Sequence, residues 1–221
     1  GATSAALKNI SLTIPQGRAV GIIGGSGAGK TTLIDVILGL LTPDQGTVRV
    51  DGKDIQTNLR GWQNQIGYVP QNIYLIDDTL RSNIAFGIAP HQINDSAVWS
   101  ALRAAQLKEF GKQLPDGLET FVGERGVRLS GGQRQRIGIA RALYHDPGVL
   151  VLDEATNALD KVTEQGVMDA VRALHGKKTV LIVAHRDSTI EHCDIVVRLA
   201  RGSVAEISHA KSLLATRRPV A

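Results

Sequence analysis

The sequence predicts an α/β protein whose mostly parallel sheet is interrupted by a helical insertion. Two apolar runs, residues 149–152 and 179–183, are typical of strands that are buried on both faces of a parallel sheet. A third apolar run, residues 19–23, ends in a glycine-rich turn that opens a helical pattern. Strand patterns are missing from the sequence between residues 72 and 128, which favours helices there.

These patterns also predict the domain organisation. The 221 residues are enough for one sizeable α/β domain or for two small lobes. We expect a single domain over residues 1–221, in which residues 1–71 and 145–221 form the α/β core. Residues 72–144 then form an inserted helical subdomain that carries a serine–glycine loop described below.

The remaining elements follow from periodicity and turn residues. Residues 7–14 alternate, with Ile10, Leu12 and Ile14 on one side. Asp51-Gly52 after an apolar strand indicates a hairpin, and Asp77-Asp78-Thr79 is typical of a helix start. Further strands are expected at 47–51, 66–69, and in a hairpin of 195–199 with 203–207; helices are expected at 32–41, 94–110, 134–144, 161–174 and 209–215.

Composition excludes several classes of protein. The chain is 43% hydrophobic and 21% charged, which is ordinary globular composition. A net charge of +4 without a stripe of basic and aromatic residues does not indicate a nucleic-acid partner. The single cysteine, Cys193, excludes an internal disulfide and fits a reducing compartment. Apolar runs such as residues 180–184 are too short to span a bilayer, so we expect this chain by itself to be soluble.

The glycine-rich turn at residues 24–32 matches the pattern G-x-x-x-x-G-K-[ST]. Glycines lack a Cβ, so backbone N–H groups can turn inward around an anion, and the helix start adds more N–H groups. Lys30 can reach the β- and γ-phosphates of a nucleotide, and the Thr31 hydroxyl can bind Mg²⁺. The alternative is a glycine-rich turn with an exposed lysine. The residues expected to bind a nucleoside triphosphate are Gly25, Ser26, Gly27, Ala28, Gly29, Lys30, Thr31 and Thr32.

A second candidate anion site precedes the helix expected at residues 134–144. Ser130, Gly131, Gly132 and Gln133 combine a hydroxyl, two glycines and a helix start, although Ser130 could be only an N-cap. One chain would then carry two phosphate loops about a hundred residues apart but a single lysine loop. This imbalance predicts a pair of chains, each offering its serine–glycine loop to the nucleotide of the other under two-fold symmetry.

Two acidic residues, Asp153 and Glu154, end the apolar run at 149–152. Ligands of open α/β sheets bind at the carboxyl ends of the strands, beside the phosphate loop. Asp153 would hold Mg²⁺ directly or through water, and Glu154 would act as general base towards the attacking water. The alternative is an acidic pair that caps the next helix.

Three single polar residues follow other elements of the expected core. Gln71, after the strand at 66–69, could orient water or a Mg²⁺ ligand, or could be surface. His185, after the strand at 179–183, could bond the γ-phosphate as a neutral imidazole, or could be structural. Asp160 could cap the next helix or cross the interface between two chains. The residue types alone leave these alternatives open.

Together these motifs resemble the nucleotide-binding domain of an ATP-binding-cassette (ABC) transporter of the exporter type. Residues 24–32 match the Walker A motif of that family, residues 149–154 its Walker B motif with the catalytic glutamate, and residues 129–133 its signature loop. Gln71, Asp160 and His185 fall where the family has its Q-, D- and H-loop residues. The resemblance covers nearly the whole chain and follows the order of the family motifs.

The resemblance implies a P-loop NTPase core with an antiparallel β subdomain and a helical subdomain that carries the signature loop. It implies that two copies, head to tail, bind and hydrolyse ATP with Mg²⁺, using Glu154, His185 and Gln71 as catalytic residues. The implied partner is the transmembrane domain of an exporter at the cytoplasmic face of the inner membrane, and no nucleic acid is expected.

Two segments resemble exporters in particular, namely residues 121–126 and residues 83–87, which in exporters face the membrane domain. Residues 68–87 are similar to lipid-linked glycan flippases and polysaccharide exporters. One departure is that residues 1–6 lack the aromatic residue on which exporters stack adenine. The alternatives to an exporter domain are a soluble ABC ATPase acting on DNA or ribosomes, and a nucleotide-responsive module that does not hydrolyse ATP.

Overall fold

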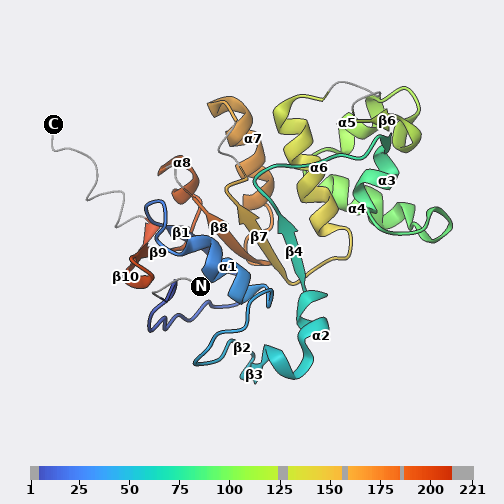
Figure 1. The fold of residues 1–221 in the computed structure, drawn as a ribbon. Coiled ribbons are helices and arrows are strands. Elements are labelled where there is room, and N and C mark those ends of the chain that lie inside the picture. Colours follow the sequence, from blue (N-terminus) through green and yellow to red (C-terminus); the bar gives the residue numbers. More distant parts are fainter. Residues whose placement is uncertain (1–4, 124–128, 156–158, 185–186, 211–221) are drawn as a thin grey trace, which may run out of the picture.

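The computed structural model describes residues 5–123, 129–155, 159–184 and 187–210, and its centre is a six-stranded sheet (Figure 1). All neighbouring strands of this sheet are parallel except one pair at its edge, in which β10 (Ser203–His209) runs antiparallel to β9 (Ile195–Ala200). The prediction of a mostly parallel sheet is therefore confirmed. The strand order is β10 (Ser203–His209), β9 (Ile195–Ala200), β1 (Ala19–Ile23), β8 (Thr179–Val183), β7 (Val149–Asp153) and β4 (Ile66–Val69).

Successive side chains of a strand point to opposite faces of the sheet. The central strands are apolar on both faces, and helices cover both. Val20 and Ile22 of β1 belong to the buried cluster of the first helix, and we call this side the α1 face. Ala19 and Ile23 of the same strand belong to the buried cluster of the two later helices. These helices are α1 (Lys30–Ile37), α6 (Gly131–Leu143) and α7 (Lys161–Arg172).

The expected hairpin at Asp51-Gly52 is confirmed, although its strands are shorter than predicted. β2 (Arg49–Val50) pairs antiparallel with β3 (Lys53–Asp54), and both turn residues have positive φ angles, 51° at Asp51 and 78° at Gly52. A hairpin turn of this kind matches the twist of the flanking strands. A 3₁₀ helix (Ile55–Asn58) and α2 (Leu59–Gln63) then lead to β4.

Residues 7–14 alternate as expected but form no regular strand. Ile10, Leu12 and Ile14 are half-buried and pack against the α1-face cluster, whereas the residues between them are exposed. The alternation therefore predicts correctly which residues are buried. It does not predict the backbone hydrogen bonds, which these residues do not form in the pattern of a strand.

The inserted segment is mostly helical, but the single helix expected at 94–110 is wrong. The chain forms two helices instead, broken at Gln106, whose φ angle is 55°. The Leu107 N–H bonds the Leu102 carbonyl at 2.7 Å and the Gln106 N–H bonds that of Arg103 at 3.0 Å, the pattern that ends helices at a left-handed residue. The helices of the insertion are α3 (Leu80–Ile84), α4 (Asp95–Ala104) and α5 (Lys108–Gln113), with 3₁₀ turns at Pro90–Gln92 and Gly117–Glu119.

The expectation of no strands between residues 72 and 128 is also wrong, since β5 (Asp78–Thr79) pairs with β6 (Phe121–Val122). Two-residue strands carry no recognisable alternation. The helix start expected at Asp77–Thr79 is confirmed, because the Thr79 hydroxyl accepts the Ser82 N–H at 3.1 Å and caps α3.

Arg141 of α6 bonds the first part of the inserted segment, around α3. Arg141 donates from Nε to the Asn83 carbonyl at 2.8 Å and from a terminal nitrogen to the Tyr74 carbonyl at 2.9 Å. Its guanidinium also lies 4.9 Å from the centre of the Phe86 ring. The segment that follows Gln71 is therefore held on the helix that follows Ser130.

The C-terminal part follows the predicted order, with a short extra helix, α8 (Asp187–Ile190), between β8 and β9. The helix expected from His209 lies almost wholly outside the described residues, and His209 itself ends β10. None of the helices in the described ranges combines the length and the apolar character that a membrane span requires.

Candidate functional site

The loop between β1 and α1 leaves a helix start without a side-chain cap. Gly27 and Gly29 adopt positive φ angles of 73° and 99°, which other residues reach only with strain. Gly29 is the N-cap of α1, and no side chain bonds the N–H groups of the first turn. These donors and the positive end of the helix dipole are therefore directed at whatever occupies the loop.

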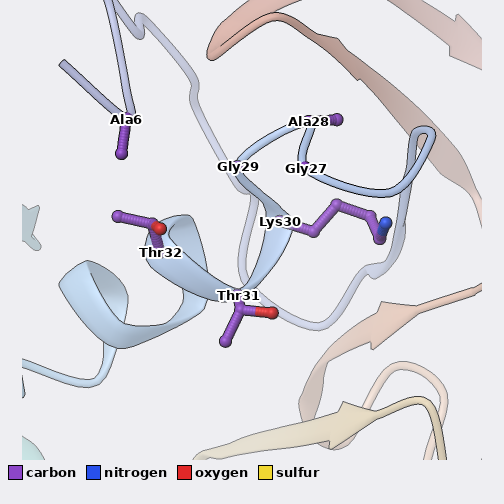
Figure 2. A pocket seen from close by; sticks show the side chains of 7 residues that line it. All are labelled: Ala6, Gly27, Ala28, Gly29, Lys30, Thr31 and Thr32. Atoms are coloured by element: carbon purple, nitrogen blue, oxygen red, sulfur yellow. The ribbon is translucent and has the colours of Figure 1, made fainter. Parts of the chain in front are cut away.

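An open hollow of about 200 Å³ lies at this helix start, and Figure 2 shows the loop curving around the Lys30 side chain. The hydroxyl-bearing side chains of Thr31 and Thr32 project from the first turn of α1. Apart from Ala6, the residues that line the hollow come from the loop and from the first turn of α1; they are Gly27, Ala28, Gly29, Lys30, Thr31 and Thr32.

The Lys30 ammonium group is tethered inside this loop. Nζ donates to the carbonyl oxygens of Gly24 at 2.9 Å and Gly25 at 3.1 Å, and the residue is only 7% exposed. An ammonium group has three donors, so two of them are used by these bonds. The sequence alternative of an exposed lysine is therefore wrong.

The acidic strand end shares this site. Asp153 is the last residue of β7, and the Tyr68 hydroxyl donates to its Oδ2 at 3.1 Å. Burial raises the pKa of Asp153, whereas the Tyr68 hydrogen bond and the charge of Lys30 act to lower it. Burial and the neighbouring Asp153 raise the pKa of Tyr68 to about 12. β1 and β7 both pair in parallel with β8, and Ile22 and Asp153 lie opposite the same residue, Val183. The lysine loop and the acidic strand end therefore lie at the same edge of the sheet.

The structure also brings Gln71 and Glu154 together. Gln71 Nε2 donates to Glu154 Oε2 at 3.2 Å, although the two residues are 83 positions apart. Glu154 has a φ angle of 51°, an uncommon conformation for a residue with a side chain, and its N–H bonds the Val183 carbonyl at the end of β8 at 3.3 Å. The structure therefore places Gln71, which follows β4, next to Glu154, which follows β7.

Ser130 is an N-cap, as one of its sequence alternatives stated. Its hydroxyl accepts the Gln133 N–H at 3.2 Å, and the Gln133 side chain accepts the Ser130 N–H at 2.8 Å, which completes a capping box. A Cβ on Gly131 would lie 3.2 Å from Leu159, and one on Gly132 would collide with Thr163 of α7. The serine–glycine loop therefore packs against the start of α7, and it is not among the residues that line the hollow at Lys30.

Asp160 is likewise a helix cap. Its carboxylate accepts the N–H groups of Val162 at 3.1 Å and Thr163 at 3.0 Å at the start of α7, and hydrogen bonds with Thr163 lower the pKa of Asp160. His185, expected near the γ-phosphate, lies outside the described residues.

Sequence reasoning missed Tyr68, which touches Asp153. The alternation of residues 66–69 could have placed its side chain, but only the pairing of β4 with β7 reveals the neighbour. Within the described ranges, no three His, Cys, Asp or Glu residues are grouped so as to hold a metal by themselves.

Comparison with known proteins agrees with this geometry. The model of the family described as ABC transporter matches residues 7–157. An ATP-dependent lipid A-core flippase from Cupriavidus pinatubonensis is 44% identical over 96% of the chain and 36% of its own length, and ABC transporter ATM1 from Toxoplasma gondii is 42% identical over 94% of the chain and 18% of its own length. The chain thus spans about a third of the length of the flippases that it matches.

A solved structure gives the same answer for the fold. The ATP-bound form of a bacterial Atm1-family ABC exporter superposes with a TM-score of 0.82 at 37% identity, over 97% of this chain and 38% of the exporter chain. The mixed α/β fold with its mostly parallel sheet is thus the fold of an exporter nucleotide-binding domain. The chain belongs to the ABC transporter family and is a nucleotide-binding ATPase domain of that family.

Proposed function

We propose that this chain is the motor domain of an ABC exporter, which binds and hydrolyses ATP between two copies and so drives a membrane domain. The observation that carries the proposal is that the lysine loop and the pair Asp153–Glu154 lie at the same end of the sheet, where Gln71 bonds Glu154. The uncapped start of α1 supplies N–H donors for phosphate oxygens, and the Glu154 carboxylate, which is bonded to Gln71, supplies a base. These are the two parts that phosphoryl transfer to water requires.

The residues at the site fit ATP accompanied by Mg²⁺. The first-turn N–H groups of α1 and the Lys30 ammonium would bind the β- and γ-phosphates, and Lys30 still has a donor beyond its two carbonyl partners. Thr31 and Asp153 would hold the cation, with Gln71 as a further ligand. Few protein ligands suffice, since Mg²⁺ in such sites is held by one or two side chains together with phosphate oxygens. The cation would supply charge neutralisation on the phosphates.

Glu154 is the proposed general base for the attacking water. The Gln71 amide donates to Glu154 Oε2 and so orients the carboxylate that would accept a proton from water. Gln71 therefore both orients the base and links the site to the inserted segment, in which Arg141 of α6 bonds the carbonyls of Tyr74 and Asn83. His185 would add a hydrogen bond to the γ-phosphate.

The second copy would contribute the serine–glycine loop. The Ser130 hydroxyl accepts one N–H within its own helix, but its O–H proton can still be donated to a phosphate oxygen. We propose that Ser130, Gly131, Gly132 and Gln133 of one copy bind the nucleotide held by the lysine loop of the other, with Asp160 at the interface. Two-fold symmetry then gives two identical sites.

The proposed partner in the whole protein is an exporter membrane domain at the cytoplasmic face of the inner membrane. Relatives that are three times longer, and whose names describe lipid A-core flippases, support this partner. By the same likeness we propose a lipid-linked glycan or polysaccharide as the transported substrate, in agreement with the resemblance of residues 68–87.

Phosphate release from the purified chain tests the proposed chemistry. Lys30→Ala should reduce ATP hydrolysis by at least about 100-fold, because it removes the charge that stabilises the transferred phosphoryl group. Lys53→Ala, at an exposed position in β3, is the matched control and should keep the wild-type rate. Undiminished turnover in Lys30→Ala would place the hydrolytic site elsewhere.

Sedimentation tests the proposed dimer. Glu154→Gln preserves the shape of the side chain but removes the base, so the variant should accumulate as a dimer in the presence of ATP and Mg²⁺. The wild-type chain without nucleotide serves as the monomeric reference. A Glu154→Gln chain that binds ATP and still sediments only as a monomer would contradict the shared site.

A further inference from the structure

Tyr68 occupies a position from which a side chain can reach the acidic strand end. β4 and β7 are paired in parallel, with Tyr68 opposite Val151. Val151 packs in the α1-face cluster, and strand alternation places Asp153, two residues on, towards the same face. The phenol therefore extends along the sheet edge to Asp153, where its hydroxyl donates to Oδ2 at 3.1 Å.

We infer that Tyr68 is a positioning residue for Asp153, whose hydroxyl fixes the orientation of that carboxylate and thereby sets how tightly the chain holds the divalent cation that accompanies ATP. The inference rests on the proposed function, because Asp153 is assigned there as a cation ligand. It adds a residue of β4 to a site otherwise built from the lysine loop and the end of β7.

The physical basis is the freedom of an aspartate side chain. The terminal torsion of aspartate is broad, so a carboxylate held by nothing samples many orientations. A hydrogen bond from a neighbouring group removes that freedom before the cation arrives, and such outer partners commonly tune metal sites. A carboxylate can accept about four hydrogen bonds, so one bond to Tyr68 leaves most of its lone pairs for a cation or its waters.

The chemistry of the donor also suits this role. The surroundings of Asp153 already contain the negative side chains of Asp35 and Glu154 and the positive charge of Lys30. A neutral phenol orients the carboxylate without cancelling its charge, whereas a lysine or arginine in the same place would compete with the cation. Tyr68 is 41% exposed, so burial of its ring alone does not account for a tyrosine at this position.

The test is to measure Mn²⁺ binding to the purified chain in the presence of ATP by electron paramagnetic resonance. Tyr68→Phe removes only the hydroxyl, and we expect it to raise the Mn²⁺ dissociation constant by about tenfold, the lower end of the usual range for such partners. ATP binding measured in excess chelator should stay unchanged. Tyr74→Phe removes the same atom from a ring that is 74% exposed and should leave both quantities at wild-type values.

The outcomes separate the inference from the proposed function. A Mn²⁺ dissociation constant that stays within about twofold in Tyr68→Phe, while the wild-type complex binds Mn²⁺ normally, overturns the role of Tyr68 alone. A wild-type chain that binds no Mn²⁺ with ATP overturns the proposed function as well. Tyr68→Leu, which also lacks the hydroxyl, must weaken Mn²⁺ binding in the same direction, and equal melting temperatures would show that lost stability is not the cause.

Discussion

The two glycine-containing helix starts of this chain are built differently. At α1 the N-cap is Gly29, and no side chain bonds the first-turn N–H groups. The Lys30 ammonium group donates hydrogen bonds to two carbonyl oxygens of its own loop. At α6 the N-cap is Ser130, and a reciprocal pair of hydrogen bonds with Gln133 already satisfies part of the helix end. Similar sequence elements therefore produce one helix start without a side-chain cap and one that is capped.

The difference teaches that a helix start alone does not define a phosphate site. The α1 loop has donors that nothing within its own helix satisfies, so an anion adds interactions at little cost. The α6 loop is stable by itself and keeps only the Ser130 O–H proton, together with backbone donors, for a further ligand. A loop of this second kind suits binding that occurs only when another molecule arrives.

A large effect on stability is expected where the lysine loop touches the sheet. A Cβ on Gly24 would lie 2.5 Å from the backbone oxygen of Leu199 in β9, whereas a Cβ on Gly25 would meet nothing within 4 Å. Overpacking against backbone that cannot move aside predicts that Gly24→Ala costs about 3 kcal/mol of unfolding free energy. Gly25→Ala should leave the stability close to that of the wild type.

Urea unfolding measures this pair. The Gly24→Ala midpoint should fall with an unchanged slope, because the same surface is exposed on unfolding. The melting temperature should fall by about 6–12 °C for a chain of this size. Equal midpoints for the two variants would show that β9 can move away from the loop and that the close approach of Gly24 to Leu199 does not limit stability.

The sequence predicted the α1 loop more completely than its surroundings. Lys30 and the glycines follow a fixed local spacing between a strand and a helix, so their geometry needs little information from elsewhere. Likewise the apolar runs of β7 and β8 could be recognised because strands that are buried on both faces are almost wholly apolar.

Features that depend on distant partners were not predicted. The break between α4 and α5 lies at Gln106, which has a left-handed conformation. Glycine is the usual residue at such a helix end, so a glutamine there gives no signal in the sequence. Glu164 in the first turn of α7 has the character of a surface residue in the sequence, yet it is 3% exposed and accepts the Ser188 and Thr189 hydroxyls at 2.8 and 2.9 Å. Neither partner of Glu164 can be identified before α8 is placed beside α7.

A smaller effect on stability is expected at the second helix start, and it separates the two roles of Ser130. Ser130→Ala removes the N-cap of α6 and should cost about 1 kcal/mol, which lowers the melting temperature by about 2–4 °C. Asn94 caps α4 in the same way, accepting the N–H groups of Ser96 at 2.9 Å and Ala97 at 3.2 Å. Asn94→Ala is therefore a control that removes a cap of equal worth from a loop without glycines.

Both changes should be made in the Glu154→Gln chain, where dimerisation with ATP can be followed by sedimentation. If Ser130 donates to the nucleotide of the second copy, its loss removes a charge-assisted hydrogen bond worth about 1.5–3 kcal/mol at each site. Because the dimer has two such sites, Ser130→Ala should then weaken it by about 100-fold or more, whereas Asn94→Ala should leave it intact at the same cost in stability. Equal dimerisation of the two variants would mean that Ser130 is a cap and nothing more, and the contrast between an anion loop and a loop reserved for a partner would no longer hold.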